Sequence, residues 1–443
     1  MRGVDAVRKI IIVYVLAAAL LLSGCGMRTV EDMYSPPKRT AEYEDLQQAI
    51  DSAMIDLEYA APLSGEYRQA VQMADLNGDG QDEYIVFARD TSENPLKIMI
   101  FTRDEKGCHL AETIAGRGSS FDLVEYVDLD GQGGVELVVG KQVSNLILRS
   151  VSVYTFPEGI SKRLLSVNYS KIVPVDLTRD AVSDLMIITR GEADEDNAVA
   201  AVYSYEDGVM IRSIEAELSG SSDRIKRIMV GNLYDGIPAV YVASSKHDNS
   251  IVTDVFALRG GKFTNIAFSN ESGTSVRALR NYYVYANDIN GDGTPELPDL
   301  IDMVPMERSP SAYGQQMIRW YSMKSDGTEV DIMFTFHNFD DGWYLELDEE
   351  ISSRISVVQA DGKSIFYIWY PDFEGAEELM TIHALTGADR EAAGKGKQFE
   401  LCRTEGVIYT VETEDFAAEY GITPELLAEQ FHLIQKDWKN GET

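Results

Sequence analysis

The residues best suited to chemistry form a short acidic loop, DLNGDGQDE, which starts at Asp75. Its first, third, fifth and ninth positions carry oxygen-bearing side chains, and its sixth is glycine. Calcium takes about six to eight hard oxygen ligands, and a tight glycine turn folds the early ligands around the ion. The pattern therefore predicts a calcium site. Its ligands would be the side chains of Asp75, Asn77, Asp79 and Glu83 and the backbone carbonyl of Gln81.

Copies of this loop recur along the chain. They start at Asp128 (DLDGQGGVE), Asp176 (DLTRDAVSD) and Asp288 (DINGDGTPE), with a degenerate copy at Asn232 (NLYDGIPAV). The steps between the five starts are 53, 48, 56 and 56 residues. A period of this size indicates an array of supersecondary units such as propeller blades.

The copies differ in how well they suit a cation. The fifth repeats the full set, with Asp288, Asn290, Asp292 and Glu296. The second keeps Asp128, Asp130 and Glu136 but has Gln132 at position five, which makes it a weaker match. The third has Thr178 and Ala181 at positions three and six, so we expect a bare hairpin, and the fourth has lost the acidic set.

The loop pattern is compatible with one other structure, an ordinary turn, and differs from another calcium loop, the EF-hand. Asp, Asn and Gly are also common in turns that bind no ion, so the loops could be ordinary turns. An EF-hand needs a bidentate Glu at position twelve, between two helices. Position twelve of the first copy is Val86, inside an apolar run typical of a strand, which excludes the EF-hand.

The segments around the loops are typical of β-strands. Each of the first four loops is followed by a nearly continuous apolar run, at residues 84–87, 137–139, 185–188 and 239–242. Such runs indicate strands that are covered on both faces. The first repeat contains four strand-like segments, as a propeller blade does. We therefore expect a mainly β protein, with a β-propeller of about five, and up to seven, four-stranded blades over residues 66–340.

Three stretches of the chain resemble the FG-GAP, or VCBS-type, repeat of integrin α-subunit propellers and of many secreted bacterial proteins. They are DLNGDGQDEYIV, DLDGQGGVELVV and DINGDGTPEL. The resemblance implies that each loop joins the first two strands of a blade and binds calcium on one rim. It also implies that ligands are met by loops on a propeller face. Seven blades are usual in that family. Five copies therefore leave two alternatives, a five-bladed ring closed between copies one and five, or further blades from the C-terminal part.

The N-terminus has the features of a lipoprotein signal. Three basic residues precede an apolar run over residues 10–22, which ends in Leu-Ser-Gly-Cys at Cys25. The run is short for a membrane span of ~20 residues. We expect a signal peptide over 1–24, lipidation of Cys25, a tether over 25–39 and a helix over 40–60. That helix has an acidic polar face, so it should pack on the adjacent domain rather than on lipid.

After residue 340 the loop motif stops, and a separate α+β domain is expected over 341–443. It should end in a helix that begins at Pro424, with an apolar stripe of Leu427, Phe431, Ile434 and Trp438. Tyrosines before the fifth loop could place aromatic rings on a rim. They are Tyr282, Tyr283 and Tyr285.

Composition and motifs narrow the function. With 73 acidic and 39 basic residues the net charge is −34, which argues against binding nucleic acid through charge. The five histidines are scattered, and no HExxH, nucleophile elbow or phosphate-binding loop occurs, so the chain is not expected to be an enzyme. The pairs Asp340-Asp341 and Glu349-Glu350 are interpreted as solvated charges.

Together these features predict a calcium-stabilised protein, anchored through its N-terminal lipid to the extracytoplasmic face of the cell membrane of a Gram-positive bacterium. Its partner would be an envelope protein or glycan. One alternative is an envelope hydrolase that acts on polysaccharide or lipid through carboxylates of the rim loops. Another is a structural subunit that assembles or senses something at the cell surface.

Overall fold

The computed structural model describes residues 41–105, 107–143, 148–193, 196–248, 250–275, 278–279, 284–306, 315–388, 390–393 and 398–434. The expected signal peptide, Cys25 and the tether lie outside these residues. No helix within the described part is long and apolar enough to cross a membrane.

Six antiparallel sheets follow one another along the chain, and the expectation of a mainly β fold built from four-stranded blades is confirmed. Sheet one contains β2 (Val71–Ala74), β3 (Glu83–Arg89), β4 (Leu96–Asp104) and β5 (Gly107–Gly116), and the short β1 (Glu58–Tyr59) also pairs with β3. Sheet two contains β6 (Ser120–Val127), β7 (Glu136–Gln142), β8 (Arg149–Thr155) and β9 (Lys162–Tyr169). Sheet three contains β10 (Lys171–Val175), β11 (Asp184–Thr189), β12 (Val199–Glu206), β13 (Val209–Arg212) and β14 (Ala216–Glu217).

The later sheets vary this plan. Sheet four contains β15 (Ile225–Asn232), β16 (Pro238–Ser245), β17 (Ile251–Arg259) and β18 (Lys262–Asn265). Sheet five contains β19 (Leu297–Asp302), β20 (Gln316–Met323), β21 (Glu329–Asn338), β22 (Trp343–Leu347) and β28 (Phe431–Leu433). Sheet six contains β23 (Ile355–Ala360), β24 (Lys363–Trp369), β25 (Ala376–Leu385), β27 (Ile408–Thr413) and β26 (Phe399–Arg403).

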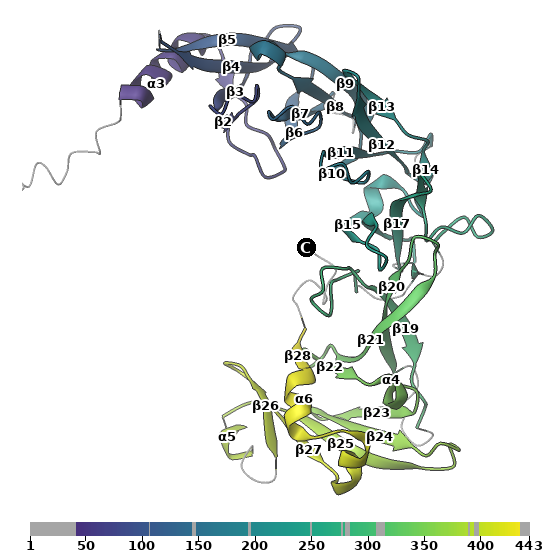
Figure 1. Ribbon diagram of the computed structural model, residues 1–443. Coiled ribbons are helices and arrows are strands. Elements are labelled where there is room, and N and C mark those ends of the chain that lie inside the picture. The colour runs from purple at the N-terminus through teal and green to yellow at the C-terminus, as the bar shows by residue number, and fades with distance from the viewer. Residues whose placement is uncertain are drawn as a thin grey trace, which may run out of the picture.

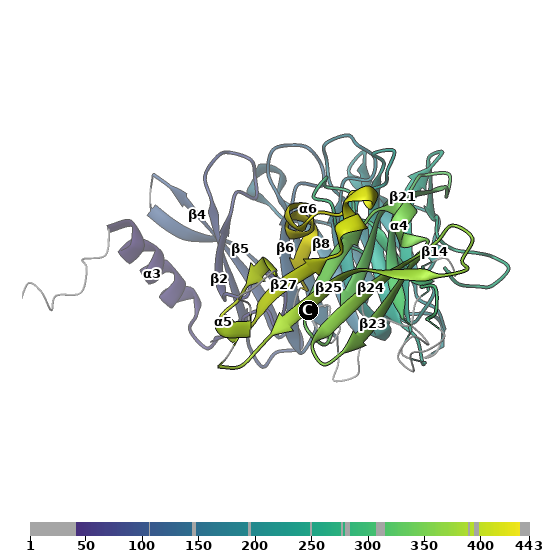
Figure 2. The same cartoon turned by 90° about the horizontal axis from the view of Figure 1, so that it is seen from below.

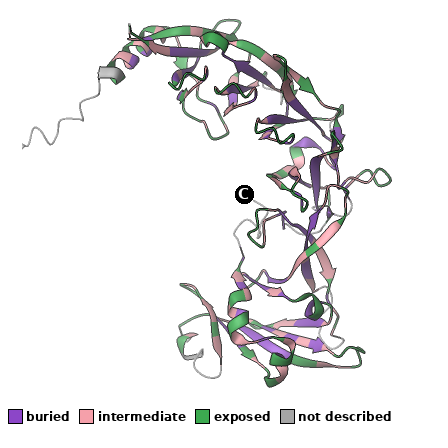
Figure 3. Ribbon diagram, in the orientation of Figure 1, coloured by how far each residue is buried: buried purple, intermediate pink, exposed green. Residues whose placement is uncertain are grey.

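The sheets stand along an open arc, with sheet one at one end and sheet six at the other (Figure 1). The first of the two alternatives, a five-bladed ring closed between copies one and five, is therefore wrong. The buried apolar clusters lie between consecutive sheets, where the strands are also most buried (Figure 3). One residue from each side identifies each interface: Ile85 and Val124, Val138 and Leu185, Met186 and Val240, Tyr241 and Tyr321, Phe336 and Phe366.

The outer face of sheet one is covered by a helix. Helix α3 (Ala41–Ala53) buries Leu46 and Ile50 against a cluster that includes Met99 of β4. Asp45 accepts a hydrogen bond of 2.7 Å from the backbone N–H of Cys108 and so ties the helix to β5. The helix is shorter than expected, but it packs on the adjacent sheet as predicted. In Figure 2 it lies at one edge of the molecule, apart from β23 and β24.

The C-terminal part does not form a unit separate from the sheets. The boundary expected at residue 341 falls between β21 and β22, which pair as a hairpin within sheet five. Beyond it, sheet six is accompanied by short helices, α4 (Glu349–Ser352), α5 (Arg390–Ala393) and α6 (Pro424–Gln430), in line with the α+β character expected. Of the two alternatives, a closed ring of five blades or further blades from the C-terminal part, the second agrees with the structure, because the C-terminal segments supply a further sheet.

The final helix is shorter than its apolar spacing predicted. Thr423 caps α6, because its hydroxyl accepts a hydrogen bond from the backbone N–H of Leu426. The helix nevertheless ends at Gln430. Phe431 then opens β28, which pairs with β22, and its ring stacks on Trp343 with centroids 5.4 Å apart. Pairing with an open sheet edge and burial of Phe431 override the local helical pattern, and Trp438 lies outside the described residues.

Candidate functional site

The acidic loops share one internal frame, set by the ninth residue. Its carboxylate accepts a hydrogen bond from the backbone N–H of the second residue in the first, second, third and fifth copies. The pairs are Glu83 with Leu76 (2.9 Å), Glu136 with Leu129 (2.7 Å), Asp184 with Leu177 (3.1 Å) and Glu296 with Ile289 (3.0 Å). All four ninth residues are buried. The last acid of the motif is therefore a structural support beneath its loop, whether or not it binds an ion.

The first residue closes the turn. In the first copy Asp75 accepts from the N–H groups of Gly78 (2.7 Å) and Gly80 (2.9 Å). In the third copy Asp176 accepts from Arg179 (2.6 Å) and Ala181 (3.1 Å), although both residues then need a positive φ, of 63° and 67°. The third copy therefore folds as the same loop and not as a plain hairpin.

The second copy gathers its acids most closely. Carboxylate oxygens of Asp128, Asp130 and Glu136 all lie within 4.8 Å of one another, and in the described part of the chain no other three acidic or metal-ligating side chains do so. Three carboxylates form a donor set of the kind that calcium prefers. The carboxylates of the second loop thus fit a hard divalent cation, although this copy has Gln132 at position five.

An asparagine at position three explains the difference. In the first copy the side-chain amide of Asn77 donates to Glu83 (3.0 Å), and in the fifth Asn290 donates to Asp292 (2.9 Å). Each amide satisfies a carboxylate within its own loop. Asp130 of the second copy cannot donate in this way when it is ionised. Its carboxylate instead adds to the repulsion that a cation would relieve.

Burial changes the acidity of the ninth residues. It raises the pKa of Glu136 to about 7, and the charges of Asp130 and Asp128 act in the same direction. Burial likewise raises the pKa of Glu296 to about 7, with Asp292 and Asp288 adding to the effect. In the first copy burial also raises the pKa of Glu83. Near neutral pH, protons therefore compete with a cation for these carboxylates.

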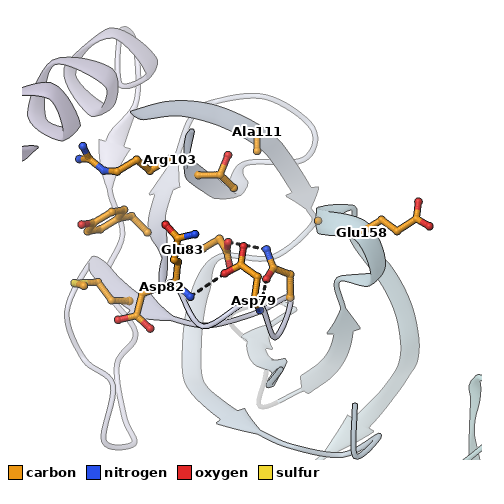
Figure 4. A pocket seen from close by; sticks show the side chains of 12 residues that line it. Asp79, Asp82, Glu83, Arg103, Ala111 and Glu158 are labelled. Carbon is orange, nitrogen blue, oxygen red and sulfur yellow. Dashed lines mark hydrogen bonds between the residues drawn. The ribbon is translucent and has the colours of Figure 1, made fainter. Parts of the chain in front are cut away.

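Two cavities open beside the loops. One of about 800 Å³ borders the first loop, and Figure 4 shows Asp79, Asp82 and Glu83 between Arg103 of sheet one and Glu158 of sheet two. The other, of about 360 Å³, contains Asp130 and Glu136 of the second loop. Leu76 and Asn77 of the first loop, together with residues from other strands and turns of sheets two and three, complete its lining. They include Thr155, Lys162 and Tyr205, which no sequence spacing linked to the loop.

Neighbouring loops are joined through their backbones. The carbonyl of Asp75 accepts from the N–H of Val135 (3.0 Å), and the carbonyl of Asp128 accepts from the N–H of Ser183 (3.0 Å). The first three loops therefore form one continuous edge, which agrees with the expectation that they lie on the same rim.

Three tyrosines were expected to place aromatic rings on a rim. Tyr285 is fully buried and so is not a rim residue, and Tyr282 and Tyr283 lie outside the described residues. Cys108 and Cys402 are unpaired. Asp341, interpreted as a solvated charge, instead accepts a hydrogen bond of 2.8 Å from the side chain of Asn338.

No protein family and no curated protein matches the chain. Among solved structures it is similar to rhamnogalacturonan lyase PL11 of Bacillus licheniformis, with a TM-score of 0.28, 10% identity and coverage of 73% of this chain and 72% of that one. For rhamnogalacturonan lyase YesW the TM-score is 0.28 and the identity 12%, with coverage of 73% of this chain and 72% of that one. For a protein from Lactobacillus plantarum the TM-score is 0.27 and the identity 11%, with coverage of 72% of this chain and 86% of that one. These scores are too low to support an argument about function.

One expectation is nevertheless corrected by these comparisons. The lack of catalytic motifs led us to expect that the chain is not an enzyme. Enzymes occur among the solved structures that the chain weakly resembles, so the expectation that it is not an enzyme is withdrawn.

Proposed function

We propose that this chain is a lipid-anchored, calcium-stabilised protein on the extracytoplasmic face of a bacterial membrane, where it binds an envelope protein or glycan. The repeats would belong to the FG-GAP or VCBS type. Cys25, after its apolar run, would carry the anchor, and the acidic loops would hold calcium.

The observation that carries the calcium part of this proposal is the cluster of Asp128, Asp130 and Glu136 on a loop whose backbone is already folded. The second loop would hold the ion through these three carboxylates. The first loop offers Asp75, Asn77, Asp79, Gln81 and Glu83, and the fifth offers Asp288, Asn290, Asp292 and Glu296. Bound calcium would neutralise charge at one rim of a very acidic chain.

The anchor and the binding role can be tested together. Metabolic labelling with a palmitate analogue should mark the wild-type protein and leave the Cys25→Ala variant unlabelled. The labelled protein, solubilised in mild detergent, should retain an envelope protein or glycan in a pull-down, and a chelator should weaken that retention. Equal label on the Cys25→Ala variant would refute the anchor, and a pull-down identical to that of an unrelated lipoprotein would refute the binding role.

A second candidate is an envelope hydrolase, and one observation favours it. Asp130 and Glu136 lie close together in the same cavity, and the raised pKa of Glu136 suits a general acid near neutral pH. The same carboxylates cannot serve fully as calcium ligands and as an acid and base. Turnover of an envelope polysaccharide that persists in chelator and is lost in Glu136→Gln would favour the hydrolase.

A further inference from the structure

A further cavity lies between sheets two and three, away from the acidic loops. Its volume is about 930 Å³, within the range of small-molecule sites. The two ends of strand β8 show how far this cavity lies from the second acidic loop. Thr155, the last residue of β8, lies 3.5 Å from Asp130 of the second loop, whereas Arg149, the first residue, lines the cavity. We call this cavity the arginine groove.

Each wall of the groove presents a tyrosine and an arginine side by side. On sheet two, Arg149 of β8 stands opposite Tyr169 of β9. On sheet three, Tyr203 of β12 stands opposite Arg212 of β13. Both tyrosines belong to the apolar cluster between the two sheets, so they form a fixed floor from which the arginines extend.

The charge of the groove differs from that of the other cavities. Its lining contains Arg149, Arg190 and Arg212 against the carboxylates of Glu192 and Asp223. By contrast, carboxylates outnumber cations in the cavities beside the first loop, beside the second loop and beside Asp326. In a chain with a net charge of −34, a cavity whose lining presents three guanidinium groups is suited to an anionic ligand where their N–H groups are not all used by neighbouring carboxylates.

The two wall arginines retain donors for a ligand. Arg149 meets Asp122 through Nη1 at 3.5 Å, and the Tyr169 hydroxyl also donates to Asp122, which is buried. Arg212 meets Glu215 through Nη2. A guanidinium has five N–H donors, and the side chains of Arg149 and Arg212 are 41% and 49% exposed. The ion pairs therefore position the guanidinium groups and leave other N–H groups facing solvent.

From this geometry we propose that the arginine groove binds an anionic sugar unit, whose carboxylate or phosphate is held by Arg149 and Arg212. A guanidinium fork matches either anion through paired hydrogen bonds. Polar side chains of Asn168, Ser170 and Thr189 line the same cavity and would meet sugar hydroxyls. The inference deepens the proposed binding role and rests on it for the source of the glycan. It does not depend on calcium or on the anchor.

The test is a calorimetric titration of the full-length protein in detergent with three probes. These are a galacturonic acid trisaccharide, its methyl ester and glucose 6-phosphate. We expect the trisaccharide or the sugar phosphate to bind, and the double variant Arg149→Gln with Arg212→Gln to lose at least tenfold in affinity. The neutral methyl ester should not bind. Binding by only one anion identifies a carboxylate or a phosphate source.

The matched control is Arg89→Gln, which removes the same charge from an exposed arginine that pairs with Glu58 outside the groove. It should bind like the wild type, and melting curves of all variants show whether each has folded. Failure of both anions to bind, equal binding of the ester, or unchanged affinity in the double variant would overturn the site. An envelope pull-down that still succeeds in that case would leave the broader binding proposal standing.

Discussion

The second and third loops have almost the same backbone and very different chemistry. In both, the ninth residue supports the second, and the first residue accepts the N–H of the fourth. Only the second loop brings three carboxylates together, because Asp130 of that loop is replaced by Thr178 in the third.

This comparison separates two roles within one motif. The first and ninth acids fold the loop, and the acid at position three decides whether three carboxylates come together in it. Arg179 and Ala181 adopt positive φ without glycine, so these hydrogen bonds are sufficient to impose the turn. The predictions below test that division of roles.

The largest effect should follow removal of the ninth residue from either loop. Glu136→Ala and Asp184→Ala each leave a buried N–H, of Leu129 or Leu177, without its partner, at a cost of about 1–3 kcal/mol. Urea unfolding should show a similar loss in both variants. Asp180→Ala, at an exposed position of the third loop, is the control and should change stability little. A loss confined to Glu136→Ala would mean that the two loops do not share a frame.

The second prediction concerns pH in the absence of divalent cations. The folded pKa of Glu136 is about 7, above its ordinary value of 4.5, so the folded state holds a proton that the unfolded state releases. Its contribution to stability is complete below pH 4.5 and is lost as the pH rises through 7. A rise from 4.5 to about 7, at about 1.4 kcal/mol per pKa unit, gives a loss of about 3 kcal/mol at most, and screening by solvent reduces it to the order of 2 kcal/mol.

Chemical unfolding in chelator at a series of pH values measures this slope. Glu136→Gln, which stays neutral, should flatten it. Part of the slope should remain, because burial raises the pKa of Glu296 to about 7 as well. A slope that Glu136→Gln leaves unchanged would contradict the assignment.

Calcium should produce a smaller effect. With dissociation constants of ~10⁻⁴–10⁻³ M, millimolar calcium stabilises each occupied loop by about 0.4–1.4 kcal/mol, seen as a modest rise in melting temperature. Asp130→Asn should reduce the rise, and Thr178→Asp should increase it by giving the third loop its missing carboxylate. The paired change Asp79→Ala with Asp292→Ala tests the first and fifth loops. A melting temperature unmoved by chelation would identify the loops as ordinary turns.

The smallest effect should come from the turn residues. Gly131 has a φ of 68°, and a Cβ there would lie 3.0 Å from a methyl group of Val182, so Gly131→Ala should cost about 1 kcal/mol. Arg179, at the equivalent position of the third loop, already bears the strain. Arg179→Gly should therefore be neutral or slightly stabilising, as thermal melting can show.

The repeat made much of the fold predictable. The acidic loop indicated where the first two strands of each blade meet, and the four strand-like segments expected in the first repeat appear as β2, β3, β4 and β5. The open arc could not be predicted. Whether the sheets close into a ring depends on the small rotation between each packed pair of sheets, and no single residue of the sequence reveals that rotation. The path of Phe431 also escaped prediction, since its partner β22 lies more than eighty residues earlier.

For the site, the motif identified the acids that lie together in the second loop, but not the hydrogen bonds that the asparagines make inside the first and fifth loops. Counting oxygen atoms ranks Asn77 and Asp130 alike, yet an amide donates a hydrogen bond to a neighbouring carboxylate and an ionised carboxylate does not. The arginine groove left no local signal, because Arg149 and Arg212 are 63 residues apart in sequence and meet only through the packing of two sheets.

The open arc also bears on how such a chain can vary in length. In a closed ring each added blade must be accommodated by all the others, since the angles between blades must sum to a full circle. An arc whose sheets pack only on their neighbours carries no such constraint, and its stability grows roughly as a sum of sheets and interfaces. Gain or loss of one whole repeat would lengthen or shorten the arc and leave every other interface as it was, so the number of repeats can change by duplication without a new architecture.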